Sequence, residues 1–410
     1  MPGWLMEAGA YAMLINATST PYLPLAGFLC SDLLEAAKKT RIRDSYTWAR
    51  LYVRVTLNTR TADCPVISRI NGINGNQTIT IPALTTGVFE DNVNSDNIVN
   101  DDLVNWRLSV PSGGSNLYIS VVSSFLTSVS NVTISQANSP NELQVFGITR
   151  YYTVLGVVQQ VAAEVDTQQL LRQASTLSNL RAYIKTNNLD GASTLRLRVN
   201  GADVNQVLDI GAATTGEFED AVNTDDVVSG NRINYAVVTG GTAGVLGTTI
   251  IHIKSAAPNR WLGCAKSLGR SFDRITTYYT VGESSLDSNN VEANVQTKVR
   301  GAINLKNLLV KVLTNNLNSA STFRTRKNAG NGNLNVSIGA AATGEFEDTG
   351  NSDSYAAADL FNFQLVAGGT DTETILLSIA VVEQYQTAAP TGIEDKSANM
   401  GNKMVGVGLI

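Results

Sequence analysis

The sequence predicts an all-β protein with three tandem β-sandwich domains from an internal triplication, for two reasons. First, the string Thr-Gly-x-Phe-Glu-Asp occurs at residues 86–91, 215–220 and 343–348, at spacings of 129 and 128 residues. The same spacings align Arg69 and Asp96 with identical residues in the later copies. This period is that of a domain of ~100–150 residues, not of a solenoid unit of ~20–50 residues. Second, each copy reads as a series of short strands separated by turns.

The strands of one copy show the alternation of apolar and polar residues that is typical of a half-buried sheet. Leu51, Val53 and Val55 alternate in this way, and so do Ile79 and Ile81 further along. Asn-Gly or Asn-Ala-Gly turns and Gly-Gly pairs separate the runs, because Asn and Gly tolerate the positive φ of tight turns. Many short strands at regular spacing favour a β-sandwich or a small barrel.

Two aromatic positions recur in register and are expected to lie in the cores. They are Phe89, Phe218 and Phe346, and Trp106, Tyr235 and Phe363. A short helical turn is expected at residues 31–39, where an N-cap precedes helix formers, whereas residues 291–296 in copy three look more extended.

The repeat register divides the chain into three domains and a tail. The predicted divisions are 1–140, 141–268, 269–387 and, for the tail, 388–410. Residues 123–150 and 254–277 are expected to be loop-rich connectors. The tail ends in Val405, Val407, Leu409 and Ile410, which alternate as an added strand would, so we expect it to dock on a sheet edge of another domain or chain.

The composition favours a globular protein that works by association. Hydrophobic residues make up 43% of the chain, but charged residues only 16%, against a typical ~25%. A net charge of −5 without a basic run argues against a nucleic-acid partner. No apolar run approaches the ~18 residues of a membrane span, and the first residues lack the features of a secretory signal. Cys30, Cys64 and Cys264 do not recur in register, so we expect reduced thiols and assembly in a cytoplasm.

Each Phe-Glu-Asp string begins an acidic loop that is a candidate cation site. Carboxylate and amide oxygens suit Ca²⁺, although the spacing is not that of an EF-hand. The alternative, which we favour, is that these side chains cap turns of their own loop. Paired carboxylates for glycoside hydrolysis are a third and weaker interpretation. The candidate ligands are Glu90, Asp91, Asn94, Asp96, Glu219, Asp220, Asn223, Asp225, Glu347, Asp348, Asn351 and Asp353.

Opposite charges at two further positions recur in every copy. They are Glu35 and Arg43, Glu164 and Arg172, and Glu292 and Arg300. An ion pair inside each domain is the favoured interpretation. The more specific alternative is an ion pair between domains that fixes how they dock. Arg69 and its equivalents are expected on one sheet face, where a carboxylate of the acidic loop is a plausible partner.

The residues needed for catalysis are largely missing, which predicts that the chain is not an enzyme. His252 is the single histidine and lies in an alternating strand, so an ordinary strand role is expected. No nucleophile elbow, phosphate-binding loop or zinc motif occurs.

The pattern over residues 291–353 resembles tandem β-sandwich repeats in virion proteins of tailed phages and uncultured environmental viruses. It runs through Val-Glu-Ala-Asn-Val-Gln, Ser-Thr-Phe-Arg-x-Arg-x-Asn and Thr-Gly-x-Phe-Glu-Asp-x-x-Asn-Ser-Asp. Such families carry no catalytic residues, and the resemblance implies a capsid, decoration or fibre component. Copy one departs from the pattern at Val88, where the other copies have glutamate.

We therefore expect three jelly-roll-like sandwiches in a non-enzymatic virion protein that binds copies of itself and other virion proteins. A homo-oligomer or large symmetric assembly, formed in the host cytoplasm, is the expected state. A microbial surface or filament adhesin and a carbohydrate-binding protein are the alternatives. The three domains either surround a pseudo-threefold axis, which we favour, or follow one another like beads in a fibre.

Overall fold

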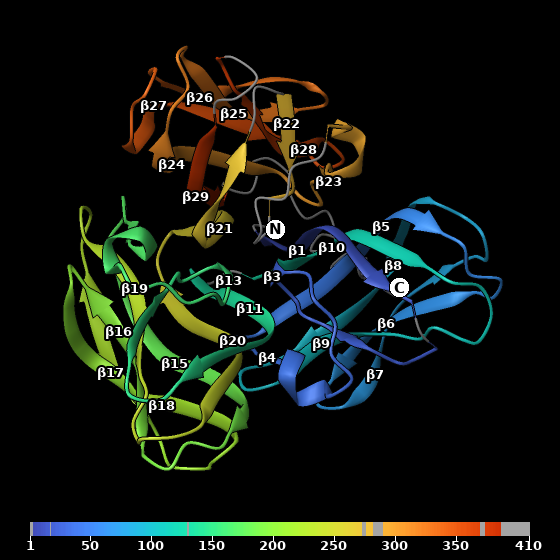
Figure 1. Cartoon of the computed structure of the whole chain (residues 1–410). Coiled ribbons are helices and arrows are strands. Elements are labelled where there is room, and N and C mark those ends of the chain that lie inside the picture. Colours follow the sequence, from blue (N-terminus) through green and yellow to red (C-terminus); the bar gives the residue numbers. More distant parts are fainter. Residues whose placement is uncertain are drawn as a thin grey trace, which may run out of the picture.

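The computed structural model consists of three β-sandwiches that surround a common centre (Figure 1). It describes residues 3–16, 18–128, 131–272, 276–281, 290–369 and 374–386. No helix within these ranges is long and apolar enough to cross a membrane.

The strands of the three sandwiches follow the same order. The first contains β1 (Gly3–Ile15), β2 (Tyr22–Leu23), β3 (Gly27–Phe28), β4 (Thr40–Arg41), β5 (Tyr46–Asn58), β6 (Cys64–Ile70), β7 (Ile73–Ile81), β8 (Gly87–Ile98), β9 (Leu103–Leu108) and β10 (Leu117–Thr127). The second contains β11 (Val132–Val145), β12 (Thr149–Tyr152), β13 (Gly156–Val157), β14 (Gln169–Leu170), β15 (Ser175–Asn187), β16 (Ser193–Val199), β17 (Ala202–Ile210), β18 (Gly216–Val227), β19 (Arg232–Val238) and β20 (Val245–Ala256). The third contains β21 (Asn259–Phe272), β22 (Thr276–Tyr279), β23 (Thr297–Lys298), β24 (Ile303–Asn315), β25 (Ser321–Lys327), β26 (Gly330–Ile338), β27 (Gly344–Tyr355), β28 (Leu360–Val366) and β29 (Ile375–Gln386).

Each sandwich is a jelly roll. If its eight principal strands are lettered B to I along the chain, one sheet has the order B-I-D-G and the facing sheet the order C-H-E-F. In the first sandwich these sheets are β1-β10-β5-β8 and β2-β9-β6-β7, and the other two repeat the order. This order is the double Greek key of a jelly roll, so the predicted fold class is confirmed.

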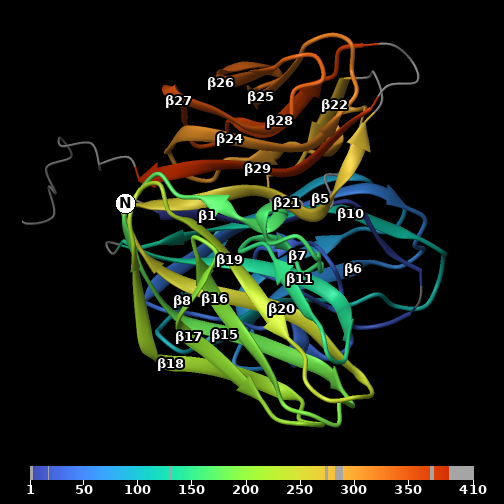
Figure 2. The same cartoon turned by 60° about the vertical axis from the view of Figure 1, so that its left-hand side comes forward.

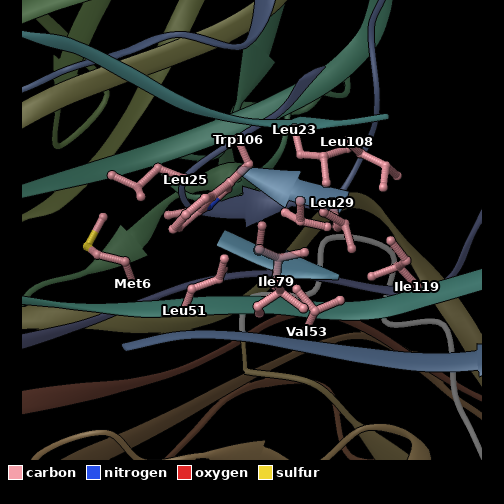
Figure 3. Packing of buried hydrophobic residues seen from close by; sticks show 14 of the residues in the cluster. Met6, Leu23, Leu25, Leu29, Leu51, Val53, Ile79, Trp106, Leu108 and Ile119 are labelled. Atoms are coloured by element: carbon pink, nitrogen blue, oxygen red, sulfur yellow. The ribbon is translucent and has the colours of Figure 1, made fainter. Parts of the chain in front are cut away.

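Large aromatic and aliphatic side chains fill the space between the two sheets. In the first sandwich Trp48 and Trp106 contact each other with ring centroids 4.3 Å apart, and Leu51, Val53 and Ile79 pack around them (Figure 3). Trp106 and its equivalents Tyr235 and Phe363 are fully buried, as the sequence predicts.

The second recurrent aromatic is only half-buried. Phe89, Phe218 and Phe346 occupy equivalent sites on the G strands β8, β18 and β27 and pack against the edge of their own cores. Each G strand is the last strand of its sheet. A side chain there has a neighbouring strand on one side only, so the expectation of complete burial was wrong in degree.

The predicted domain boundaries at 140/141 and 268/269 fall inside strands. β11 pairs with β20 along most of its length, and β21 pairs with β29, so each begins the sandwich that follows it. The segments expected to be connectors are therefore mostly strands, and only residues 128–131 and 257–258 join the sandwiches.

A 3₁₀ turn precedes the D strand in every repeat. The turns span Glu35–Lys38, Glu164–Thr167 and Glu292–Asn294, so the segment of copy three that looked extended is a turn as well. The turn Glu164–Thr167 lies at a border between sandwiches, because the Val165 carbonyl accepts a hydrogen bond from Lys311 of the next repeat.

The three B strands β1, β11 and β21 meet near the centre of the molecule (Figure 1). Figure 2 shows β29 of the third sandwich beside β1 of the first. Leu5 and Phe125 of the first repeat belong to the core of the third, whereas Leu309 and Ile379 of the third belong to the core of the second. Each core therefore includes side chains of a neighbouring repeat.

Candidate functional site: the interfaces between repeats

The same arginine–glutamate pair joins each repeat to the next. Arg43 Nη2 lies 2.7 Å from Glu219 Oε1, and Arg172 Nε donates to Glu347 Oε1 at 2.8 Å. Arg300 Nη1 donates to Glu90 Oε1 at 2.8 Å. The arginine of the first repeat binds the second repeat at the first interface, and the arginine of the second repeat binds the third at the second interface. The arginine of the third repeat binds the first at the third interface, so every arginine of this set has an acceptor in another repeat.

These pairs are largely removed from water at two of the three interfaces. The side chains of Arg43 and Arg300 are 3% and 4% exposed, whereas Arg172 is 31% exposed. Burial lowers the pKa of Arg43 and Arg300 although their glutamates oppose this shift. Burial alone would raise the pKa of Glu90, but Arg300 and Lys298 outweigh it and the pKa is lowered. Glu90 is therefore ionised at neutral pH.

Backbone carbonyl groups of the 3₁₀ turns supply a second set of contacts. Arg181 Nη1 donates to the Lys39 carbonyl at 2.9 Å, and Tyr52 Oη donates to the Gln296 carbonyl at 3.2 Å. Lys311 Nζ donates to the carbonyl of Val165. In each case a D strand binds the turn of the repeat before it.

The three interfaces differ in how many charges they hold. Arg41 and Arg181 both bind Glu217 at the first interface, and the pKa of Glu217 falls to about 2 because these contacts outweigh its burial. Arg232 binds Glu345 at the second interface. The third interface has Val88 at this position, so Lys298 and Arg300 share Glu90.

The predicted partner of the recurrent arginine was wrong. Glu35 does not bind Arg43 but contacts Arg69 Nε at 3.2 Å within its own repeat. Glu164 and Glu292 bind Arg198 and Arg326 in the same way, at 2.6 and 2.8 Å. The acidic loop is therefore not the partner of Arg69, and the Arg43 position is left to reach the neighbouring repeat.

The carboxylates of the acidic loops bind donors of the protein itself. Asp91 accepts hydrogen bonds from the backbone N–H groups of Thr78, Val93 and Asn94. Asp96 accepts a hydrogen bond from Ser68 Oγ at 2.6 Å. Asp220 and Asp348 accept hydrogen bonds from the equivalent backbone N–H groups, and Asp225 and Asp353 accept them from the backbone N–H groups of Asn205 and Asn333.

Glu90, in contrast, points to Arg300. Within the part of the chain that the structure describes, no group of three or more His, Cys, Asp or Glu residues is arranged to hold a metal. The calcium interpretation of the twelve loop residues therefore has no geometric support, since their carboxylate oxygens point to different places and already accept protein donors.

His252 lies inside the first interface. Its side chain is fully buried, and Nε2 lies 3.1 Å from Nη1 of Arg181. Burial, together with Arg181, Arg43 and Arg41, holds the pKa of His252 well below its ordinary value. A neutral imidazole in a cluster of arginines is a packing partner and an acceptor for a guanidinium group.

Sequence reasoning missed a set of polar contacts near the centre. Gln136 Nε2 donates to the Ala26 carbonyl at 3.1 Å, and Thr40 Oγ1 donates to Gln136 Oε1 at 2.7 Å. Gln384 Nε2 donates to the Gly3 carbonyl at 3.0 Å. Gln136 and Gln384 do not recur in the repeat pattern, so the pattern gave no signal for them. The predicted docking residues Val405, Val407, Leu409 and Ile410 lie outside the described residues.

Comparison with known proteins gives no family for this chain. No family model matches the sequence, and no curated protein matches it. Among solved structures, the chain is similar to one described as "The Triple Jelly Roll Fold and Turret Assembly in an Archaeal Virus", at 14% identity and a TM-score of 0.18 over 93% of this chain and 91% of the other.

Two structures of infectious bursal disease virus are also similar. The Gx strain matches at 9% identity and a TM-score of 0.21, over 94% of this chain and 81% of the other. The Gt strain matches at 8% identity and a TM-score of 0.18, over 95% and 82%. The jelly-roll assignment therefore rests on the strand order of this chain itself.

Proposed function

We propose that this chain is a non-enzymatic structural protein of a virus particle, in which three fused jelly rolls form one pseudo-threefold building block. The observation that carries the proposal is the recurrent Arg–Glu contact, which runs in one direction and returns from the third repeat to the first. A head-to-tail interface of this kind gives a ring when its rotation closes. Fusion of the copies makes the ring independent of protein concentration.

The chemistry of the interfaces supports association rather than catalysis. The pKa shifts of Glu217 and His252 arise from groups that hold one repeat against another. A catalytic group with a shifted pKa would instead face a cleft that admits a substrate.

The partners we propose are further copies of the chain and other virion proteins, after assembly in the host cytoplasm. The ring uses its head-to-tail surfaces internally, so copies must meet through other surfaces. Within the described residues, no further strand pairs with the F and G strands at the edges of each sandwich. We retain the expectation that the C-terminal tail docks on a neighbouring chain.

Electron microscopy of the purified full chain tests this proposal. We expect single chains to appear as three-lobed rings that associate into larger symmetric assemblies at high concentration. Deletion of residues 400–410 should preserve the rings and impair assembly, and a variant that carries these eleven residues in shuffled order is the matched control. Rod-shaped monomers would contradict the ring, and a chain that stays monomeric at every concentration would contradict the structural role.

A further inference from the structure

A cysteine and a lysine of the first repeat lie in direct contact inside the protein. Lys38 Nζ is 3.0 Å from Cys30 Sγ, and the two residues are 0% and 4% exposed. Cys30 follows β3, and Lys38 ends the 3₁₀ turn Glu35–Lys38. We propose that this pair is an oxidative modification site, at which one oxygen atom links Nζ to Sγ as a covalent N–O–S bridge.

The surroundings of the amine favour a product without charge. Apart from Cys30, Lys38 Nζ donates to the Ser139 carbonyl of the second repeat at 2.6 Å. Within the described residues, no carboxylate lies within ion-pair distance of this amine, and the nearby Asp32 binds Lys185 at 2.6 Å instead. A buried ammonium group without a carboxylate is costly. The bridge removes that charge, while the remaining N–H still donates to Ser139.

The position of the thiol determines which oxidant can act. Burial raises the pKa of Cys30, although Lys38 opposes this shift, so the thiolate is scarce and the reaction requires a small neutral oxidant such as hydrogen peroxide. The balanced reaction is R–SH + R′–NH₂ + 2 H₂O₂ → R–S–O–NH–R′ + 3 H₂O. The sulfur and the nitrogen each lose one hydrogen, and the two peroxides accept four electrons.

Cys64 is the natural control inside the same repeat. It is also fully buried and free, but its Sγ contacts the Ala62 carbonyl at 3.6 Å and no lysine. Peroxide can carry such a thiol along the usual sequence of sulfenic and sulfinic acids, without a link to nitrogen. Serine occupies the equivalent positions 193 and 321, so Cys64→Ser is a mild substitution.

The bridge would lock the segment that carries the first interface. It would close residues 30–38 into a loop, immediately before Thr40, Arg41 and Arg43, which contact the second repeat. A cross-link lowers the entropy of the unfolded chain. We therefore expect oxidised protein to melt a few degrees higher than reduced protein.

Mass spectrometry of the full chain after incubation with dilute hydrogen peroxide tests the proposal. We expect a gain of one oxygen and a loss of two hydrogens, about +14 Da, which dithiothreitol reverses, whereas a sulfenic acid adds about +16 Da. Trypsin should then cut after Lys39 and no longer after Lys38, which gives a peptide of residues 1–39. Cys64→Ser should keep the +14 Da product, and Cys30→Ser should abolish it.

The wild-type peptide map decides the question even if Cys30→Ser fails to fold. Products of +16 or +32 Da on Cys30 with normal cleavage after Lys38 would overturn the proposal. No mass change after complete exposure to peroxide would overturn it as well.

Discussion

At the scale of single residues, one arginine and one glutamate per repeat form the contact that recurs at all three interfaces. Arg43, Arg172 and Arg300 come from equivalent positions, but they are shielded from water to different degrees. A pair that is hidden from water depends strongly on both partners, because removal of one leaves the other charge buried.

Substitution of Arg300 by methionine should destabilise the chain by about 2–3 kcal/mol, less than the ~3–5 kcal/mol of a fully buried pair because Lys298 still faces Glu90. The midpoint of urea denaturation measures this change. Lys327→Met removes a more exposed pair with Asp359 and should cost below about 1 kcal/mol. Equal losses in the two variants would contradict the role of burial.

Introduction of glutamate at Val88 should strengthen the third interface. Val88 is exposed, pairs with Arg54 in the sheet and occupies the position at which Glu217 and Glu345 bind cations of the preceding repeat. We expect a gain of up to about 0.5–1 kcal/mol that fades at high salt. Val93→Glu, on the same strand at an exposed site, is the control and should give no gain.

Acidification should weaken the first interface through His252. The pKa of His252 is lowered in the folded protein. Above the ordinary histidine pKa of ~6.5, His252 is therefore neutral in both the folded and the unfolded chain. Below that pH the unfolded chain binds one proton more, so stability falls by up to about 1.4 kcal/mol per pH unit.

Thermal melts of the wild type and of His252→Gln between pH 7 and pH 5 test this dependence. The variant should show the flatter profile in this window. Glu217, with a pKa lowered to about 2, loses its contribution only as the pH falls through ~4.5 and below, so it does not interfere. Parallel profiles for both proteins would mean that His252 takes up its proton in the folded state.

At the scale of elements, the G strand performs two tasks with adjacent residues. Its glutamate points to the neighbouring repeat, while the next residue, an aspartate, turns into its own loop and binds backbone N–H groups of the F and G strands. The aspartate therefore stabilises its own sandwich, whereas the glutamate beside it holds the neighbouring repeat.

Substitution of Asp220 by asparagine should therefore destabilise the second sandwich. Asp220 accepts hydrogen bonds from Val207 N, Val222 N and Asn223 N at 3.0–3.2 Å, and an amide offers one oxygen in place of two. We expect a loss of about 1–3 kcal/mol by urea denaturation. Asp209→Asn, on the exposed face of the adjacent strand β17, should have little effect.

Calcium titration separates this structural role from metal binding. Millimolar Ca²⁺ should leave the melting temperature of the wild type unchanged, because the loop oxygens already accept protein donors. A rise that Asp220→Asn removes would restore the cation interpretation.

At the scale of the whole molecule, the described ends of the chain meet. Gln384 near the end of β29 donates to Gly3 at the start of β1, so the third and first repeats touch where no peptide bond joins them. This contact joins the third repeat to the first, whereas the links at residues 128–131 and 257–258 join the other neighbouring repeats.

A circular permutant should therefore fold normally when a short linker joins residue 386 to residue 3 and the new ends lie between Ala257 and Pro258. Solution scattering should give the radius of gyration of the wild type. A permutant opened after Ile251, inside β20, should unfold because that strand lies between β11 and β15. An elongated first permutant would contradict a closed arrangement.

The sequence alone determined the triplication, the β-class and the buried aromatics such as Trp106, because these follow from periodicity within one repeat. It also placed Arg43 among the significant residues, but the choice of its partner required the structure. Arg43 contacts Asp101 of its own repeat and Glu219 of the next, and only the mutual orientation of the sandwiches brings Glu219 within reach.

The tertiary structure likewise decided the domain boundaries. β11 reads as a connector because it lacks the alternation of a half-buried strand: Thr133, Ser135, Gln136 and Asn138 are all buried. They are polar because this strand lies at the centre of the molecule, where the neighbouring sandwich supplies hydrogen-bond partners such as the Ala26 carbonyl. The alternation of apolar and polar residues reveals a strand that has one buried and one exposed face. It does not reveal a strand whose second face is covered by another domain.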